Sequence, residues 1–182
     1  MYISITVRTW GILLVKFIVD EMLGNVVRWL RILGFDTLDA SSLRIDPGED
    51  IDTKILFSAL EDGRILVTAD INLAQRGKRL GVKVVTVNHS VENICQMMRR
   101  ILQEANAWGE AKKHMMTRCP VCNGLLRPIE KNKVRDKVPE KVFLRVEKFW
   151  ECTGCGKIYW IGTHFKNINK TIECIFAHGG EG

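Results

Sequence analysis

Residues 13–34, with the sequence LLVKFIVDEMLGNVVRWLRILG, join a short apolar run to a longer amphipathic one. The run from Leu13 to Val19, interrupted only by Lys16, is typical of a buried strand. From Met22 to Leu33 the apolar residues recur at helical spacing, and Gly34 is placed to end that helix. The stretch therefore predicts a strand followed by a helix, the first βα unit of an α/β domain.

The same alternation continues to about residue 105. In chain order it predicts a strand near residues 37–38 with a helix around Ile55–Leu60, a strand over 64–68 with a helix over 71–80, and a strand over 82–87 with a helix from Ser90 to about Ala105. Gly81 is placed to stop one of these helices, and Ser90 is the expected N-cap of the last. Four such units in sequence predict a mostly parallel sheet with helices on both faces.

The composition is that of an ordinary globular protein. The chain has 182 residues, of which 46% are hydrophobic and 26% are charged, enough for one or two small domains. Its apolar runs fall far short of the about 20 residues that a membrane-spanning helix needs. The N-terminus also lacks the basic and apolar regions of a secretion signal. We therefore expect a cytoplasmic protein with no membrane partner.

Positive charge is concentrated in the C-terminal part of the chain. The net charge is +6, with 13 Lys and Arg against 14 Asp and Glu in residues 1–110 and 14 against 7 in residues 111–182. A basic excess of this size favours a polyanionic partner, most often nucleic acid. A solvated basic face is the alternative.

Four of the six cysteines form two C-x-x-C pairs, Cys119 with Cys122 and Cys152 with Cys155. Each pair presents two thiolates from one tight turn, and two pairs together make a closed tetrahedral site, so the spacing predicts one structural zinc ion. A redox C-x-x-C motif needs only one pair beside a βαβ unit and fits less well. Cys95 lies on an apolar helical face and is expected in the core as a buried thiol, while Cys174 has no assignment.

The segments predict a two-domain organisation. We expect an N-terminal extension or extra strand (1–15), the α/β domain (16–105), a linker (106–117), a β-rich zinc ribbon with strands over 141–150 and 157–160 (118–168), and a C-terminal tail (169–182).

Acidic residues follow the predicted strands at the edge where parallel α/β proteins bind ligands. Asp20 ends the first strand, Asp70 follows the third, and Asp52 lies near the start of the helix between them. Glu21 and Asp50 are additional acidic candidates. Carboxylates that converge without a nearby Lys or Arg repel one another unless a divalent cation lies between them, and such a cluster suits Mg²⁺ or Mn²⁺.

These aspartates have other interpretations. Each precedes a predicted helix, where aspartate is a favoured N-cap. A phospho-acceptor receiver domain also uses acidic residues after its first and third strands, but it needs a lysine after a fifth strand, and no fifth unit is visible. A dinucleotide site is excluded, because the turn after the first strand has a single glycine, Gly24, placed too late.

Several motifs together resemble one known family. Residues 16–24 (KFIVDEMLG), 28–37 (RWLRILGFDT), 63–70 (GRILVTAD), 119–124 (CPVCNG), 149–160 (FWECTGCGKIYW) and 162–164 (GTH) are similar to the Mut-7 C-terminal RNase domain family. The resemblance covers about residues 16–168. It implies a PIN-like three-layer nuclease domain with an attached zinc ribbon, and metal-dependent cleavage of RNA.

The resemblance also implies roles for particular residues. Asp20, Asp52 and Asp70 would hold Mg²⁺ or Mn²⁺, which lowers the pKa of a bound water that attacks the scissile phosphate. The products would carry a 5′ phosphate and a 3′ hydroxyl. The usual fourth acidic position is occupied here by Asn88 and His89.

Basic and aromatic residues are the expected RNA contacts. The candidates are Arg28, Arg31 and Arg76 in the nuclease domain and Lys131, Lys133, Lys137, Trp160 and His164 in the ribbon. We expect an endoribonuclease that cleaves single-stranded or unpaired RNA, with ribosomal and transfer RNA as candidate partners and the oligomeric state left open. The alternative is a catalytically weak or inactive factor that binds RNA or ribosomes.

Overall fold

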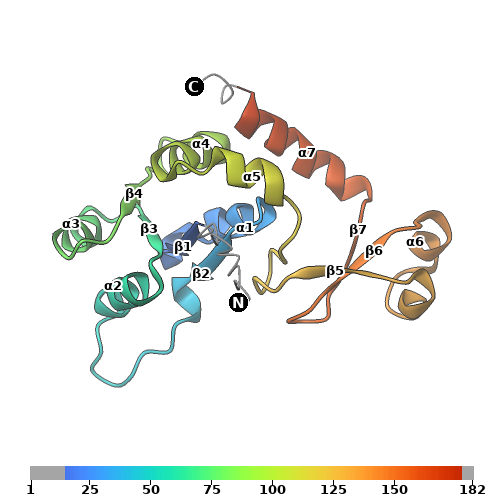
Figure 1. The fold of residues 1–182 in the computed structure, drawn as a ribbon, viewed down its shortest axis with the longest axis horizontal. Coiled ribbons are helices and arrows are strands. Elements are labelled where there is room, and N and C mark those ends of the chain that lie inside the picture. The colour runs from blue at the N-terminus through green and yellow to red at the C-terminus, as the bar shows by residue number, and fades with distance from the viewer. Residues whose placement is uncertain (1–14, 178–182) are drawn as a thin grey trace, which may run out of the picture.

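Four parallel strands form a central sheet in the order β2-β1-β3-β4 (Figure 1). The computed structural model describes residues 15–177, apart from the side chains of residues 163 and 164, so the expected extension or extra strand at 1–15 lies outside it except for Val15. The strands are β1 (Lys16–Val19), β2 (Asp36–Asp39), β3 (Ile65–Thr68) and β4 (Val84–Thr86). This sheet confirms the α/β fold that the sequence predicts.

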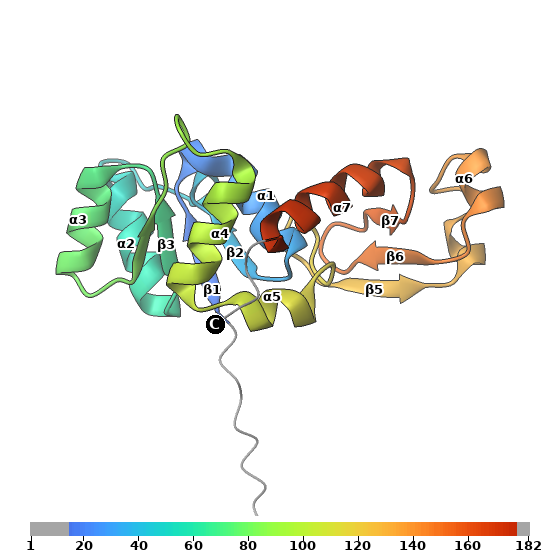
Figure 2. The same ribbon diagram turned by 90° about the horizontal axis from the view of Figure 1, so that it is seen from above.

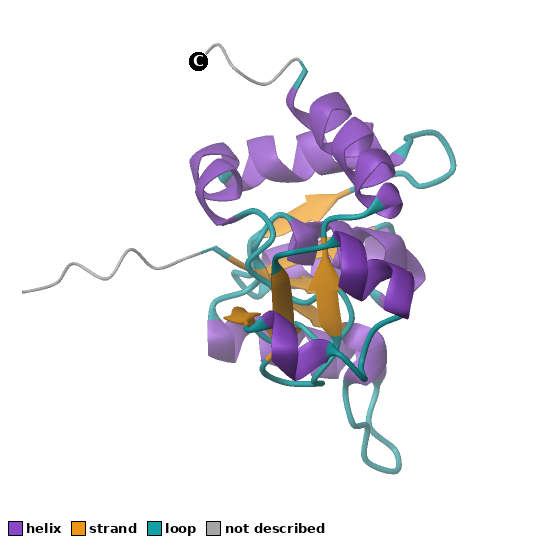
Figure 3. Ribbon diagram, turned by 90° about the vertical axis from the view of Figure 1, so that its right-hand side faces the viewer, coloured by secondary structure: helices purple, strands orange, loops and turns teal. Residues whose placement is uncertain are grey.

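Each face of the sheet packs against its own pair of helices (Figure 3). The helices are α1 (Gly24–Ile32) and α4 (Ile94–Ala105) on one face, and α2 (Ile51–Asp62) and α3 (Ile71–Arg79) on the other. Phe17 and Val19 of β1 pack with the first pair, whereas Ile18 packs with the second. Because successive side chains of a strand point to opposite faces, a four-residue strand contributes to both cores.

The helix ends are partly as predicted. Gly34 and Gly81 follow α1 and α3 with φ values of +93° and +85°, a left-handed conformation that glycine adopts without steric cost. The prediction that Ser90 is the N-cap of α4 is wrong. Asn93 caps α4 instead, because its side chain accepts the Gln96 N–H while the Gln96 side chain accepts the Asn93 N–H, which satisfies two backbone donors at once.

The ribbon is a three-stranded antiparallel sheet that extends away from the central sheet (Figure 2). Its strands are β5 (Leu126–Ile129), β6 (Phe149–Cys152) and β7 (Ile158–Trp160). The strand expected over residues 141–150 is wrong for most of its length, because α6 (Glu140–Arg145) occupies the first half. This helix starts directly after Pro139, a residue that needs no N–H partner at a helix start.

Helices also occupy the expected linker and tail. α5 (Trp108–His114) lies within residues 106–117, and Ala107 and Ala111 are fully buried against the core of the α1 face. α7 (Thr163–Phe176) runs past residue 168 and returns to lie beside α4 (Figure 1). Short 3-10 helices at Glu21–Leu23, Ala40–Ser42 and Lys131–Val134 complete the described elements. In this part of the chain no helix is both long and apolar enough to cross a membrane.

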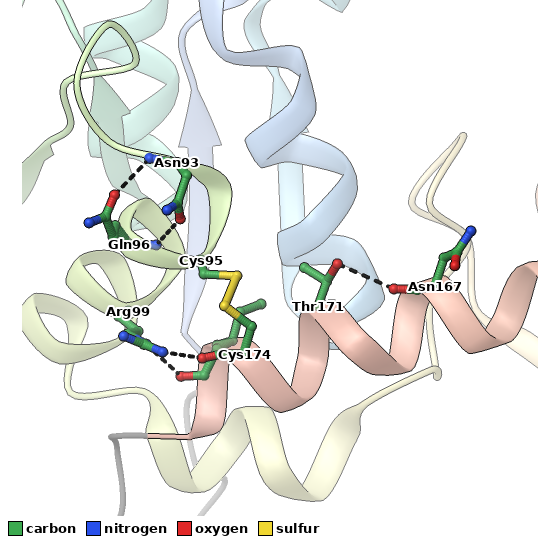
Figure 4. The surroundings of a disulfide bond; sticks show 8 residues. Asn93, Cys95, Gln96, Arg99, Asn167, Thr171 and Cys174 are labelled. Atoms are coloured by element: carbon green, nitrogen blue, oxygen red, sulfur yellow. Dashed lines mark hydrogen bonds between the residues drawn. A yellow bond between two sulfur atoms is a disulfide. The ribbon is translucent and has the colours of Figure 1, made fainter.

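A disulfide fastens α7 to α4. Cys95 of α4 is bonded to Cys174 of α7, and Arg99 donates hydrogen bonds to the backbone carbonyls of Cys174 and Ile175 (Figure 4). The expected buried thiol at Cys95 is therefore corrected. The two cysteines are 79 residues apart, and only the return of α7 brings them together.

Candidate functional site

Thr68 links Asp20 and Asp70 at the carboxyl ends of β1 and β3. These strands are neighbours, with Val19 opposite Val67. The Thr68 hydroxyl is fully buried, donates a hydrogen bond to Asp20 Oδ2 at 2.6 Å and accepts the Asp70 N–H at 2.9 Å. Thr68 therefore connects the Asp20 carboxylate to the Asp70 backbone, because the two residues follow neighbouring strands. Sequence reasoning missed Thr68, although its place at the end of β3, two residues before Asp70, was the available signal.

The capping interpretation holds for one of these aspartates. Asp70 accepts the N–H groups of Asn72 and Leu73 and caps α3. Asp20 is 8% exposed and makes no side-chain capping bond to the helical turn that follows it. Its buried carboxylate is instead held by Thr68, so capping does not explain why an acidic residue stands there.

Asp52 lies in an ion pair that the sequence reasoning did not foresee. Arg76 of α3 donates to Asp52 Oδ2 at 3.0 Å and to Asp50 Oδ2 at 3.2 Å. The expectation of an acidic cluster without a nearby basic residue is therefore wrong, because α2 and α3 pack on the same face of the sheet. The N-cap of α2 is Asp50, which accepts the Thr53 N–H, while Asp52 lies in the first turn.

The carboxylates influence one another electrostatically. The pKa of Asp52 is raised above its usual value, first because burial desolvates the carboxylate and then because Asp50, Asp70 and Asp20 lie near it, and Arg76 opposes this rise. The part of this rise that comes from the neighbouring carboxylates is repulsion that a bound cation would reduce.

Each aspartate keeps one oxygen available for a ligand. The protein engages Oδ2 of Asp20, Oδ2 of Asp52 and Oδ1 of Asp70, and within the described residues no hydrogen-bond donor contacts the other oxygen of each. Carboxylate oxygens are the donors that Mg²⁺ and Mn²⁺ prefer. In residues 15–177, only the cysteines form a group whose ligand atoms all lie within 4.8 Å of one another. Asp20, Asp52 and Asp70 form no such group in these residues.

Two further acidic residues follow strands of the central sheet, Glu21 after β1 and Glu92 after β4. Glu21 is exposed in the turn after Asp20. After β4, the N–H of Asn88 donates to Glu92 Oε2 at 2.7 Å, and Glu92 also forms an ion pair with Arg100. Sequence reasoning missed Glu92, because it comes four residues after the position where a fourth acid is usual.

The four cysteine thiols come together at the base of the ribbon. Cys119 and Cys155 lie 3.8 Å apart, and Cys122 and Cys152 lie 3.3 Å apart, measured between Sγ atoms. All four are free thiols, and the group can hold a zinc ion in the arrangement that the spacing predicts.

A tyrosine supports this thiol group. The Tyr159 hydroxyl lies 3.0 Å from Cys119 Sγ. Burial raises the pKa of Cys119, but hydrogen bonds from Tyr159 and from the backbone N–H groups of Cys122 and Val121 outweigh burial and lower the pKa to about 7. Sequence reasoning gave Tyr159 no role at this site.

The expected RNA contacts have different surroundings. Arg28 is exposed on α1, but Arg31 is buried and donates to the backbone carbonyls of Thr37 and Val121, so its expected phosphate contact is corrected. The ribbon lysines Lys131, Lys133 and Lys137 are paired with Glu147, Glu130 and Glu151. Trp160 is half-buried, with its ring centroid 6.5 Å from that of Phe149. The His164 side chain lies outside the described part.

One comparison identifies relatives of this chain. The model of a family described as the Mut7-C RNAse domain matches residues 15–172. The match spans the central sheet and most of α7. It includes the aspartates Asp20, Asp52 and Asp70 and the cysteines Cys119, Cys122, Cys152 and Cys155. No curated protein and no solved structure shows a significant match.

Proposed function

This chain belongs to the Mut7-C RNAse domain family, and from this premise we propose that it is a divalent-metal-dependent endoribonuclease that cleaves single-stranded or unpaired RNA. The observation that carries the proposal is the pair Asp20 and Asp70, joined through the buried Thr68 hydroxyl, with Asp52 electrostatically coupled to both. These residues stand at the carboxyl edge of a parallel sheet, where α/β proteins place their ligands.

The protein's own groups prepare the site for a cation and a phosphate. Asp20, Asp52 and Asp70 would hold one or two Mg²⁺ or Mn²⁺ ions, which when bound lower the pKa of a water and offset charge on the leaving oxygen. Thr68 fixes the orientation of Asp20, and the first turn of α3 fixes that of Asp70. Arg76 neutralises part of the negative charge and lies where it can meet a phosphate.

The ribbon is proposed to aid RNA binding. An open groove of about 490 Å³ lies between β5, β6 and the 3-10 helix Lys131–Val134, and its charged lining residues are Arg127, Lys133, Glu130 and Glu151. Lys133 is well exposed, and its ion pair with Glu130 is a surface pair that phosphate can replace at little cost. The zinc ion of the ribbon would be structural and separate from the catalytic ions. Ribosomal and transfer RNA remain candidate substrates, and a cytoplasmic location remains part of this proposal.

A second function is favoured by two observations. Arg76 already pairs with Asp50 and Asp52, and Asn88 stands where a fourth acid is usual. Both features reduce the negative charge available to bind cations. The alternative is therefore an RNA- or ribosome-binding factor with weak or no catalysis.

Cleavage of a labelled single-stranded RNA separates the two functions. Purified wild type, Asp20→Asn, Asp70→Asn and the matched control Glu61→Gln would be compared in Mg²⁺, in Mn²⁺ and in EDTA. Glu61 is an exposed carboxylate at the far end of α2, so its loss should not change the rate. We expect each aspartate variant to lose at least about 100-fold in rate, the order of magnitude for removing one electrostatic contact to the transition state.

The outcomes are distinct. Cleavage that survives EDTA, or that is equal in Asp20→Asn and wild type, would refute the nuclease mechanism. Tight RNA binding without cleavage in any metal would establish the binding-factor alternative.

A further inference from the structure

β2 is an edge strand whose outer side is bonded by the first zinc-binding turn. It pairs with β1 on one side only. On the other side the Thr37 N–H donates to Asn123 Oδ1 at 3.1 Å, and the Thr37 carbonyl accepts two N–H groups of Arg31 at 3.0 and 3.1 Å. Thr37 is fully buried. The two polar backbone groups of this residue therefore have protein partners, where an open edge would have water.

The partners of β2 belong to the turn that carries Cys119 and Cys122. Asn123 directly follows Cys122, has a φ of +68°, and donates its backbone N–H to the Cys119 carbonyl. Its side-chain amide also donates to Asp36 Oδ1 at 2.9 Å. This one side chain therefore bonds both to a β2 backbone group and to the first β2 side chain.

Arg31 makes the second connection to the same turn. Its Nη1 donates to the Val121 carbonyl at 2.8 Å, while Nε and Nη2 hold Thr37. The guanidinium is buried, and burial lowers its pKa. A buried cation needs all its donors satisfied, so Arg31 requires the Val121 carbonyl to stay in place.

We propose that the first zinc-binding turn, residues 119–124 with Cys119 and Cys122, acts as a substitute neighbour for β2, so that zinc binding at the four cysteines fixes the edge of the central sheet. Zinc binding and local folding are coupled in small thiolate sites, because the ligands converge only in the folded turn. When the metal leaves, the Val121 carbonyl and the Asn123 side chain lose their fixed positions. The Thr37 backbone groups then open to water. This inference does not depend on the proposed nuclease activity.

Amide hydrogen exchange of ¹⁵N-labelled protein tests the proposal without an activity measurement. The zinc-loaded protein would be compared with protein dialysed against EDTA under nitrogen, for wild type and two variants. Asn123→Gly removes the side chain while glycine keeps the positive φ, so the backbone of the turn is not strained. Val121→Ala is the matched control, because the Val121 side chain is 59% exposed and only its carbonyl bonds to Arg31. β4, the opposite edge strand, is the internal reference.

We expect zinc removal to speed exchange at the Thr37 amide at least about tenfold in wild type, with less than about twofold change in β4, since one lost hydrogen bond corresponds to about a factor of ten. Zinc-loaded Asn123→Gly should already show the faster exchange at Thr37, and zinc removal should add little. Zinc-loaded Val121→Ala should match wild type.

Three results would overturn the proposal. The first is unchanged Thr37 exchange after zinc removal, which would make the ribbon independent of the sheet. The second is wild-type exchange in zinc-loaded Asn123→Gly. The third is equal acceleration in β2 and β4, because the metal would then stabilise the whole molecule without using this contact.

Discussion

Replacing Gly34 by alanine measures how tightly the segment before the ribbon packs on the central domain. A Cβ at Gly34 would lie 2.0 Å from the carbonyl oxygen of His114 and 2.7 Å from its Cβ. His114 ends α5, and the Arg118 side chain donates to the Gly34 carbonyl at 3.2 Å. The substitution must therefore displace backbone at the end of α5.

Gly81 supplies a matched comparison for this substitution. Both glycines directly follow the C-cap of a nine-residue helix, and their φ values of +93° and +85° are nearly equal. A Cβ at Gly81 meets no atom within 4 Å. Gly81→Ala therefore reports the conformational cost alone, about 1 to 2 kcal/mol. Gly34→Ala adds overpacking against a backbone, about 1 to 3 kcal/mol more.

Urea unfolding of wild type and both variants gives the free energies, with the slope checked for each. We expect Gly34→Ala to lose about 2 kcal/mol more than Gly81→Ala. Equal losses of unfolding free energy in the two variants would show that the end of α5 can move away from Gly34 without cost. The interpretation of residues 106–117 as a packed part of the core would then be wrong.

Three further results are expected from the same unfolding assay. Thr68→Val should lose about 2 to 3 kcal/mol of unfolding free energy, because the buried Asp20 carboxylate loses a hydrogen bond, whereas Thr68→Ser should lose about 1 kcal/mol. Equal losses in the two variants would show that the Thr68 hydroxyl does not stabilise the fold. Replacing Cys95 and Cys174 by serine should cost up to about 4 kcal/mol, since their bond closes a long loop, and an unchanged midpoint would contradict this. The pKa of Asp36 is lowered in the folded protein, because although burial raises it, hydrogen bonding to Arg64 and other partners outweighs burial. The stability that Asp36 provides is therefore complete above the pKa of its unfolded state, about 4, and is lost as pH falls through the lower pKa of the folded state. Asp36→Asn should therefore make the free energy of unfolding depend less on pH in acid. An unchanged pH dependence would count against the ion pair with Arg64.

Local pattern predicted the central sheet because β1, β3 and β4 are short runs rich in β-branched residues, each followed by an amphipathic segment. It failed where burial depends on small residues. Residues 106–117 look polar, yet Ala107 and Ala111 lie four apart and are fully buried, a spacing that a search for large apolar residues overlooks. The segment 141–150 is rich in valine and aromatic residues, which strands favour, but Pro139 directly before α6 is the signal of a helix start.

The acidic edge was predictable because parallel strands bring their carboxyl ends together, which places Asp20 beside Asp70. The Arg76 ion pair was not, because it depends on how two helices lie across one face of the sheet. The convergence of the four cysteine thiols followed from their spacing, since the tight turns that hold each pair are local. The contacts of Asn123 with β2 join residues more than 80 apart, and no local pattern reports such a pairing.

Because α7 returns to α4, the ribbon is attached to the central domain at both of its ends. The chain leaves the central domain through α5 and comes back to it at α7, where Ile175 is fully buried in the core of the α1 face. The ribbon is thus inserted between two anchored ends, like a loop on a scaffold, and is not a pendant module. A chimaera that takes its ribbon from a relative would have to preserve both attachment points. A truncation after α5 would strip the scaffold of a core side chain as well as the zinc site.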